Sequence, residues 1–150
     1  MALSAPAPIG THHQIGDFSS GIVSLDEWLK RRAPANQATG AARTFVVCEA
    51  DRVVAYFALA SGAVNVAAAP GRFRRNMPDP IPVVVLARLA VDRAYQGQGL
   101  GRAMVRDGAK RVVHAADTIG IRGIIVHAIS DDAKAFYLAL GCEPSHRSTR

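Results

Sequence analysis

The chain has 150 residues, of which 49% are hydrophobic and 20% charged; this is ordinary for one globular domain and excludes a disordered chain. No apolar run reaches the roughly 18 residues of a membrane span, and the N-terminus lacks the basic and apolar regions of a secretory signal, so we expect a cytoplasmic protein without a membrane partner. The net charge of +6 comes mostly from arginine, which suits a phosphate-rich partner but equally reflects GC-rich codons.

The first half of the chain predicts a helix and then a β-hairpin. Ser24 and Glu27 have the spacing of a capping box, in which the Ser24 hydroxyl would cap the start of the helix. Pro34 is expected to end this helix, and a loop should follow. Residues 43–49 and 53–60 are apolar stretches on either side of a short turn, so they predict two antiparallel strands.

The middle of the chain predicts a loop, a buried strand and a long helix. Residues 70–82 contain four prolines and are typical of an irregular loop. Residues 83–91 include one polar side chain, that of Arg88, which predicts a strand buried on both faces. A glycine-rich turn follows and leads into an amphipathic helix that ends near residue 117.

The last third predicts one more strand and one more helix. Residues 121–127 form the strand, and Ser130 or Asp131 then caps a helix that Gly141 ends at the C-cap position. Because no internal repeat or long linker divides the sequence, we expect a single mixed α/β domain over residues 1–150, with helices packed on a sheet.

The cysteines argue against a disulfide framework and against a metal site. The chain has two cysteines, Cys48 and Cys142, and their spacing matches no metal-ligand pattern. Since Cys48 lies in an apolar run, we expect a buried thiol there and no bound metal.

The strongest functional signal is the glycine-rich turn over residues 96–101, which has the pattern Gln-x-x-Gly-x-Gly between a buried strand and a helix. Small residues let backbone N–H groups approach a ligand closely, and the helix N-terminus adds donors and partial positive charge, so a pyrophosphate is the natural guest. No Lys-Ser/Thr pair follows, which excludes a Walker A loop, and the glycine spacing excludes the dinucleotide fingerprint. A tight turn without a ligand is the alternative on spacing alone.

Leu-Ala-Val-Asp at residues 89–92, followed by this turn, resembles the acetyl-CoA pyrophosphate loop of the GNAT acetyltransferase superfamily. The resemblance implies acetyl-CoA as the cofactor. The strand backbone would bind the pantetheine arm, and the turn with the helix start would hold the pyrophosphate. The implied cofactor-binding residues are Leu89, Ala90, Val91, Gln96, Gly97, Gln98, Gly99, Leu100, Gly101, Arg102 and Ser130.

A second block, residues 133–141, resembles the last helix of the superfamily, with its Ala-x-x-Phe-Tyr-x-x-x-Gly signature. Tyr137 matches the tyrosine that, in the family, stands near the CoA sulfur and protonates the leaving thiolate, which implies a catalytic role. The chemistry is reasonable, since a phenol of pKa near 10 can donate to a thiolate of pKa about 8.5. Taken alone, the Phe136-Tyr137 pair would indicate core packing.

The N-terminal half resembles GNAT toxins of toxin–antitoxin systems, and the resemblance covers roughly residues 6–144. It implies acetylation of the α-amine of aminoacyl-tRNA, which blocks translation, together with a ribbon-helix-helix antitoxin and a homodimer. Arginines would bind the tRNA backbone, although each is equally readable as an ordinary solvated charge. The candidates are Arg31, Arg32, Arg72, Arg74, Arg75 and Arg93.

The sequence offers no obvious pair of carboxylates to act as a general base. An α-amine has a pKa of about 7.7–8.0, so part of it is neutral near pH 7.5, whereas a lysine near 10.4 needs more help. The missing base therefore favours an α-amine acceptor. His127 is a possible proton relay, but a structural histidine is the favoured interpretation.

The resemblance implies a mixed, mostly antiparallel sheet that splays between two central strands, with helices on both faces. After Gly141 the sequence lacks the family's usual Gly-Phe and stops at Arg150, so we expect the last strand of the family to be missing and the domain to be short at its C-terminus. Two alternatives to the toxin stay open. One is an acetyltransferase for a small amine or protein N-terminus; the other is a truncated, inactive remnant that binds CoA or the antitoxin.

Overall fold

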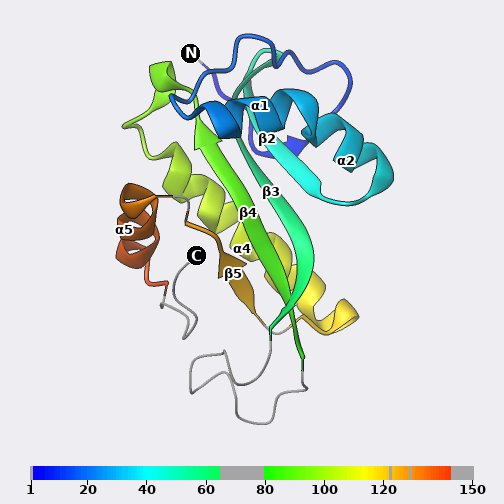
Figure 1. Cartoon of the computed structure of the whole chain (residues 1–150). Coiled ribbons are helices and arrows are strands. Elements are labelled where there is room, and N and C mark those ends of the chain that lie inside the picture. Colours follow the sequence, from blue (N-terminus) through cyan, green and yellow to red (C-terminus); the bar gives the residue numbers. More distant parts are fainter. Residues whose placement is uncertain (1, 65–79, 122, 129, 143–150) are drawn as a thin grey trace.

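The computed structural model describes residues 2–64, 80–121, 123–128 and 130–142, which form a five-stranded sheet with the order β1-β2-β3-β4-β5 (Figure 1). Neighbouring strands are antiparallel except β4 and β5, which are parallel, so the expected mixed and mostly antiparallel sheet is confirmed. The strands are β1 (Ala7–Pro8), β2 (Arg43–Glu49), β3 (Arg52–Val64), β4 (Ile81–Val91) and β5 (Ile124–Val126). The helices are α1 (Val23–Arg31), α2 (Ala33–Thr39), α4 (Leu100–Ile119) and α5 (Asp131–Ala139), with a 3₁₀ turn at Arg93–Tyr95.

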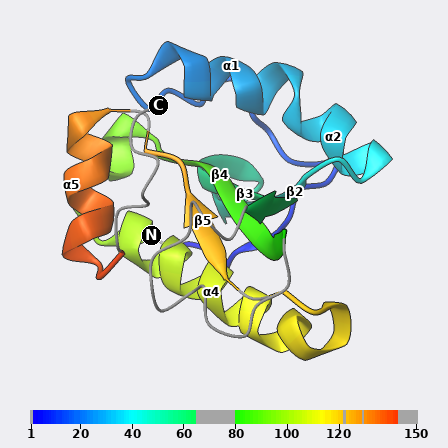
Figure 2. The ribbon, with the colours of Figure 1, turned by 60° about the horizontal axis from the view of Figure 1, so that its bottom comes forward.

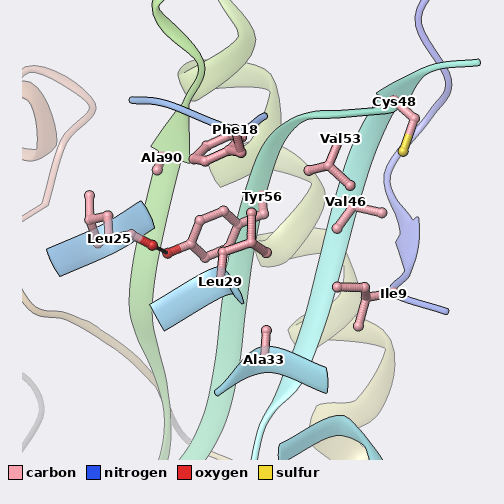
Figure 3. Packing of buried hydrophobic residues seen from close by; sticks show 10 residues of the cluster. All are labelled: Ile9, Phe18, Leu25, Leu29, Ala33, Val46, Cys48, Val53, Tyr56 and Ala90. Atoms are coloured by element: carbon pink, nitrogen blue, oxygen red, sulfur yellow. Dashed lines mark hydrogen bonds between the residues drawn. The ribbon is translucent and has the colours of Figure 1, made fainter. Parts of the chain in front are cut away.

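Helices cover both faces of the sheet, as expected: α1 and α2 lie on one face and α4 on the other (Figure 2). Successive residues of a strand point to opposite faces, so Tyr56 and Phe57 of β3 enter different halves of the core. Tyr56 packs under α1 with Phe18 and Leu29, and its hydroxyl donates a 2.7 Å hydrogen bond to the Leu25 carbonyl oxygen (Figure 3). Within the described residues, no helix is both long and apolar enough to cross a bilayer.

The predicted capping box at the start of α1 is wrong. The helix begins one residue before Ser24, with Ile22 as its N-cap, and no side-chain hydrogen bond caps it. Instead, the backbone N–H of Ile22 donates to the Ser20 hydroxyl oxygen at 3.1 Å, and that hydroxyl donates to Asp26 at 2.7 Å. The Ser20–Asp26 pair thus orders the helix entry from further upstream, and Ser24 is left exposed inside the helix.

The loop expected after Pro34 is instead a second helix, α2, which carries this proline in its first turn. The first N–H groups of a helix have no internal partner, so proline costs nothing there. Gly40 ends α2 with a φ of +82°. The sequence also missed β1, because two residues that pair with β2 show no periodicity of their own.

The two central strands are longer than predicted. β3 extends to Val64, and β4 begins at Ile81 and includes Pro82, which had been assigned to the loop. Residues of β4 are buried or half-buried throughout, which agrees with a strand covered on both faces. Residues 70–79 of the predicted loop, which include Arg72, Arg74 and Arg75, lie outside the described residues.

The C-terminal helices were predicted well. Ser130 caps α5, its Oγ accepting the Ala133 N–H at 3.1 Å, and Gly141 follows the helix with a φ of +97°. The Gly141 N–H donates to the Leu138 carbonyl and the Cys142 N–H donates to the Tyr137 carbonyl. These two hydrogen bonds form a Schellman motif. β5 is three residues long, shorter than predicted. The expectation about a missing last strand falls on residues 143–150, outside the described residues.

Candidate active site

β4 and β5, the last two strands of the described sheet, separate after a short paired stretch and leave a cleft between them. They pair through three residues each, ending at Leu86 and Val126. Beyond this point, Ala87–Leu89 of β4 face His127 and α5 across a cavity of about 280 Å³, and Ile22 and Leu25 of α1 close one side. The separation of two parallel strands therefore creates a small, partly apolar cleft, which is the predicted splay.

Tyr137 of α5 lines this cleft and is 8% exposed. Burial raises the pKa of its phenol to about 12, with a smaller contribution from the charge of the Cys142 thiolate. The hydroxyl is therefore protonated across the physiological range. The ring packs edge-on against Phe136, with 5.2 Å between centroids, and the Schellman motif fixes the end of its helix. Tyr137 is thus a protonated phenol, fixed by its packing, in the lining of the cleft.

A second hollow, of about 380 Å³, lies at the glycine-rich turn and the start of α4. Gly97 and Gly99 adopt φ values of +80° and +83°, and a Cβ built on either would meet no atom within 4 Å. Gly99 is the N-cap of α4, and no side chain caps the helix. Leu100–Arg102, the first turn of α4, line the hollow, and the start of a helix is an arrangement that suits a phosphate.

Gly101 has a different role from the two glycines before it. A Cβ at this position would lie 3.2 Å from the Cζ atom of Phe136 in α5. The absence of a side chain therefore lets the start of α4 approach the helix that carries Tyr137. The glycines thus have two roles: Gly97 and Gly99 leave the turn open, and Gly101 lets α4 pack closely against α5.

The Gln96 side chain braces the turn. Its Nε2 donates to the Val91 carbonyl at 2.8 Å and to the Ser20 carbonyl at 2.9 Å. Asp92 adds to this brace, since its carboxylate accepts the backbone N–H groups of Ser19 and Ala94, both at 3.0 Å. These hydrogen bonds join the segment before α1 to the glycine-rich turn. The positions of the two hollows are therefore linked through the same contacts.

The structure distributes the remaining sequence-predicted residues as follows. Leu89 and Ser130 line the cleft with Tyr137, and Val91 lines the second hollow with the turn. Ala90 is buried in the core on the α1 side, and Gln98 is exposed on the turn. Among the candidate RNA-binding residues, Arg31, Arg32 and Arg93 are exposed and line neither hollow.

Sequence reasoning missed the cleft residue Leu25 of α1 and, on β4, Ala87 and Arg88 beside the predicted Leu89. Arg88 was noted as the polar residue of a buried strand, and the structure places it in the cleft, with its guanidinium carbon 4.8 Å from the centroid of the Trp28 ring. A cation in an apolar strand just before the glycine turn was the signal that could have identified it. His127 lines the cleft and is exposed. The described residues contain no group of three or more His, Cys, Asp or Glu that could hold a metal.

Comparisons with known proteins point in one direction. The sequence profile of the acetyltransferase (GNAT) domain matches residues 40–144. A tRNA-acetylating toxin of Mycobacterium tuberculosis is 54% identical over 142 residues, which cover 95% of this chain and 86% of that protein. A probable toxin TacT of Sinorhizobium fredii is 28% identical over 88% of this chain and 79% of its own.

Two solved structures have the same fold. AtaT complexed with acetyl-methionyl-tRNAfMet matches with a TM-score of 0.89 and 27% identity over 96% of this chain and 88% of that chain. AtaTR bound with AcCoA matches with a TM-score of 0.82 and 28% identity, over 95% and 86% of the two chains.

Proposed function

The chain belongs to the GNAT acetyltransferase family, and we propose that it is a toxin that transfers the acetyl group of acetyl-CoA to the α-amine of aminoacyl-tRNA, which blocks translation. The observation that carries the proposal is the 54% identity to a tRNA-acetylating toxin over nearly the whole chain, with Tyr137 held in the cleft. We also propose that residues 1–150 act as one acetyltransferase domain, and that it acts in the cytoplasm, where charged tRNA is found.

Acetyl-CoA fits the two hollows as its donor. It supplies a thioester, whose carbonyl carbon the amine attacks. The first turn of α4 presents backbone groups to the pyrophosphate, with Gly97 and Gly99 leaving space for it. Leu89 lines the cleft and Val91 lines the second hollow, so the pantetheine arm would run along β4 from one to the other.

The chemistry then depends on Tyr137. The amine nitrogen forms a bond to the acetyl carbon, the carbon–sulfur bond breaks, and Tyr137 passes its phenolic proton to the sulfur. Because burial raises the pKa of Tyr137, the phenol still carries its proton at physiological pH when the thiolate forms. The new amide loses its extra proton to solvent, and solvent reprotonates the phenolate, so the chain ends the cycle unchanged.

We propose an α-amine acceptor because an amine of low pKa needs less help from a base than a lysine does, and the described part of the cleft contains no pair of carboxylates. Asp132 and His127 are the titratable groups, apart from Tyr137 and Arg88, that line it. An α-amine near pKa 8 is already partly neutral at physiological pH, so it needs no dedicated base.

The relatives also suggest a protein partner. One solved structure is a mutant form of the AtaT toxin bound to the C-terminus of the antitoxin AtaR, at 25% identity and a TM-score of 0.82. We propose that this chain is neutralised by an antitoxin in the same way. A ribbon-helix-helix fold for that antitoxin and a homodimer for the toxin remain predictions from the family resemblance.

A label-transfer assay tests the acceptor. Purified protein is mixed with labelled acetyl-CoA and, in parallel, with charged tRNA, deacylated tRNA, a peptide with an open N-terminus and a small alkyl amine. The proposal expects label in charged tRNA alone. Transfer to the peptide or the amine, with charged tRNA unlabelled, would assign the other acceptor class. A folded protein that binds no acetyl-CoA would be the inactive remnant.

A further inference from the structure

We propose that Arg88 binds the carbonyl oxygen next to the acceptor amine and so selects acceptors whose amine is α to a carbonyl group. The inference rests on the proposed function and adds a residue that recognises the acceptor substrate. The observation behind it is that Arg88, the residue before Leu89 on β4, lines the cleft.

Arg88 is held by a stack built on the core. Its guanidinium carbon lies 4.8 Å from the centroid of the Trp28 ring. Trp28 in turn stacks on Tyr56, with 5.9 Å between centroids and 10° between the ring planes. Tyr56 is fully buried, and its hydroxyl is bonded to the Leu25 carbonyl. The Trp28 ring, itself supported by the core, therefore holds the Arg88 guanidinium in a defined position.

The Arg88 guanidinium carbon lies over the Trp28 ring, which is the placement that stacking of a guanidinium on an aromatic face gives. The N–H groups of arginine lie in the guanidinium plane, so a contact through the face leaves them available to an oxygen. Arg88 lines the same cleft as Tyr137, the proposed donor to the leaving sulfur. At about 280 Å³, the cavity lies just below the roughly 300–1,000 Å³ found for ligand sites, so only the reacting end of the acceptor enters it.

The neighbour of the amine then decides the fit. In an aminoacyl ester one carbon separates the amine nitrogen from the carbonyl group, whereas four methylenes precede the amine of a lysine side chain and carry no acceptor oxygen. A guanidinium beside the amine therefore has a partner in the first case and none in the second, and the half-buried Arg88 would be costly to leave unpaired once the acceptor displaces water from it. Arg88 favours an α-amino carbonyl compound by this route.

The test measures acetylation of charged tRNA by Arg88→Gln and Arg88→Lys across a series of salt concentrations. We expect Arg88→Gln to lower kcat/KM for charged tRNA roughly 10- to 100-fold, the range for losing a hydrogen bond to a charged group. The Kd for acetyl-CoA and the slope of log kcat/KM against log salt should not change. Arg88→Lys keeps the charge without the planar fork and should recover part of the loss.

Arg106→Gln is the matched control, because Arg106 is exposed on α4, on the opposite face of the sheet. It should behave as wild type. If Arg88→Gln folds poorly, Trp28→Phe, which keeps an aromatic platform, gives a milder version of the same loss. That variant should lower kcat/KM and leave the acetyl-CoA Kd unchanged.

Three results would overturn the assignment. An unchanged kcat/KM would show that Arg88 does not touch the acceptor. A salt slope reduced by about one would place Arg88 on a tRNA phosphate instead of the carbonyl. An equal loss of acetyl-CoA affinity would place it on the donor. Failure of wild type to acetylate any charged tRNA is a different outcome, since it removes the proposed function itself.

Discussion

The Nε2 atom of Gln96 lies 2.9 Å from the carbonyl oxygen of Ser20, although 76 residues separate the two in sequence. This hydrogen bond joins the glycine-rich turn to the segment that leads into α1. Ile22 and Leu25, at the start of that helix, form one side of the cleft. The wall of the acceptor site is therefore positioned by the turn that we assign to the pyrophosphate.

Gln96→Ala should damage the acceptor side of the reaction. The change removes two hydrogen bonds to carbonyl oxygens, worth about 1 kcal/mol of stability, and releases the entry of α1. We expect kcat/KM for charged tRNA to fall roughly tenfold, because small displacements at a reacting centre are costly. Urea unfolding and steady-state kinetics measure the two effects. Gln14→Ala, at an exposed glutamine outside both hollows, is the control, and equal kinetics in both variants would contradict the brace.

Gly99→Ala should weaken acetyl-CoA binding beyond its effect on stability. Gly99 and Gly120 stand at opposite ends of α4, with φ values of +83° and +72°, and a Cβ on either meets no atom within 4 Å. Alanine should therefore cost each site a similar ~1–2 kcal/mol of backbone strain. Of these two glycines, Gly99 lines the second hollow and Gly120 does not. Titration calorimetry should therefore show a roughly tenfold weaker acetyl-CoA Kd for Gly99→Ala and no change for Gly120→Ala. Equal affinities would remove the turn from the cofactor site.

Stability should fall above pH 10 because of two buried tyrosines. Burial raises the pKa of Tyr137 to about 12 and that of Tyr56 further. The unfolded chain releases these protons near pH 10 while the folded chain keeps them, so the free energy of unfolding is unaffected below pH 10 and decreases from there to pH 12. Urea midpoints at pH 8, 10 and 11.5 measure the decline. Tyr56→Phe should flatten it, and an unchanged decline in that variant would mean that other groups cause it.

Asp92→Ala should be strongly destabilising. The carboxylate is 5% exposed, accepts two backbone N–H groups at 3.0 Å, and lies 3.9 Å from the Arg52 guanidinium. Removing it leaves these donors unpaired, at a cost of about 2–3 kcal/mol. Asp107→Ala is the comparison, since Asp107 makes a surface ion pair with Arg111 that is worth well under 1 kcal/mol. Similar losses in the two variants would contradict the role given to Asp92.

Sequence reasoning succeeded where the signal was local. Ser130 and Gly141 mark the two ends of α5 through contacts within a few residues, and both act as predicted. The glycine-rich turn could also be predicted, since its positive φ values require glycine.

It failed where residues outside the recognised motif decide the outcome. The capping box at Ser24 has the right spacing, but Ser20 and Asp26 form a competing pair that begins upstream. Gln96 matched a cofactor motif, and its side chain is occupied by Val91 and Ser20. Arg88 became meaningful only when the fold brought it against Trp28, which lies 60 residues earlier and on a different element.

The central claim is that the acetyl group reaches the α-amine of an amino acid attached to tRNA. The direct measurement is mass spectrometry of what mild alkali releases from charged tRNA after incubation with labelled acetyl-CoA and the protein. The account predicts a labelled N-acetyl amino acid from wild type and none from Tyr137→Phe, with acetyl-CoA binding retained in that variant. Label that stays with the nucleotides, or equal labelling by Tyr137→Phe, would contradict it.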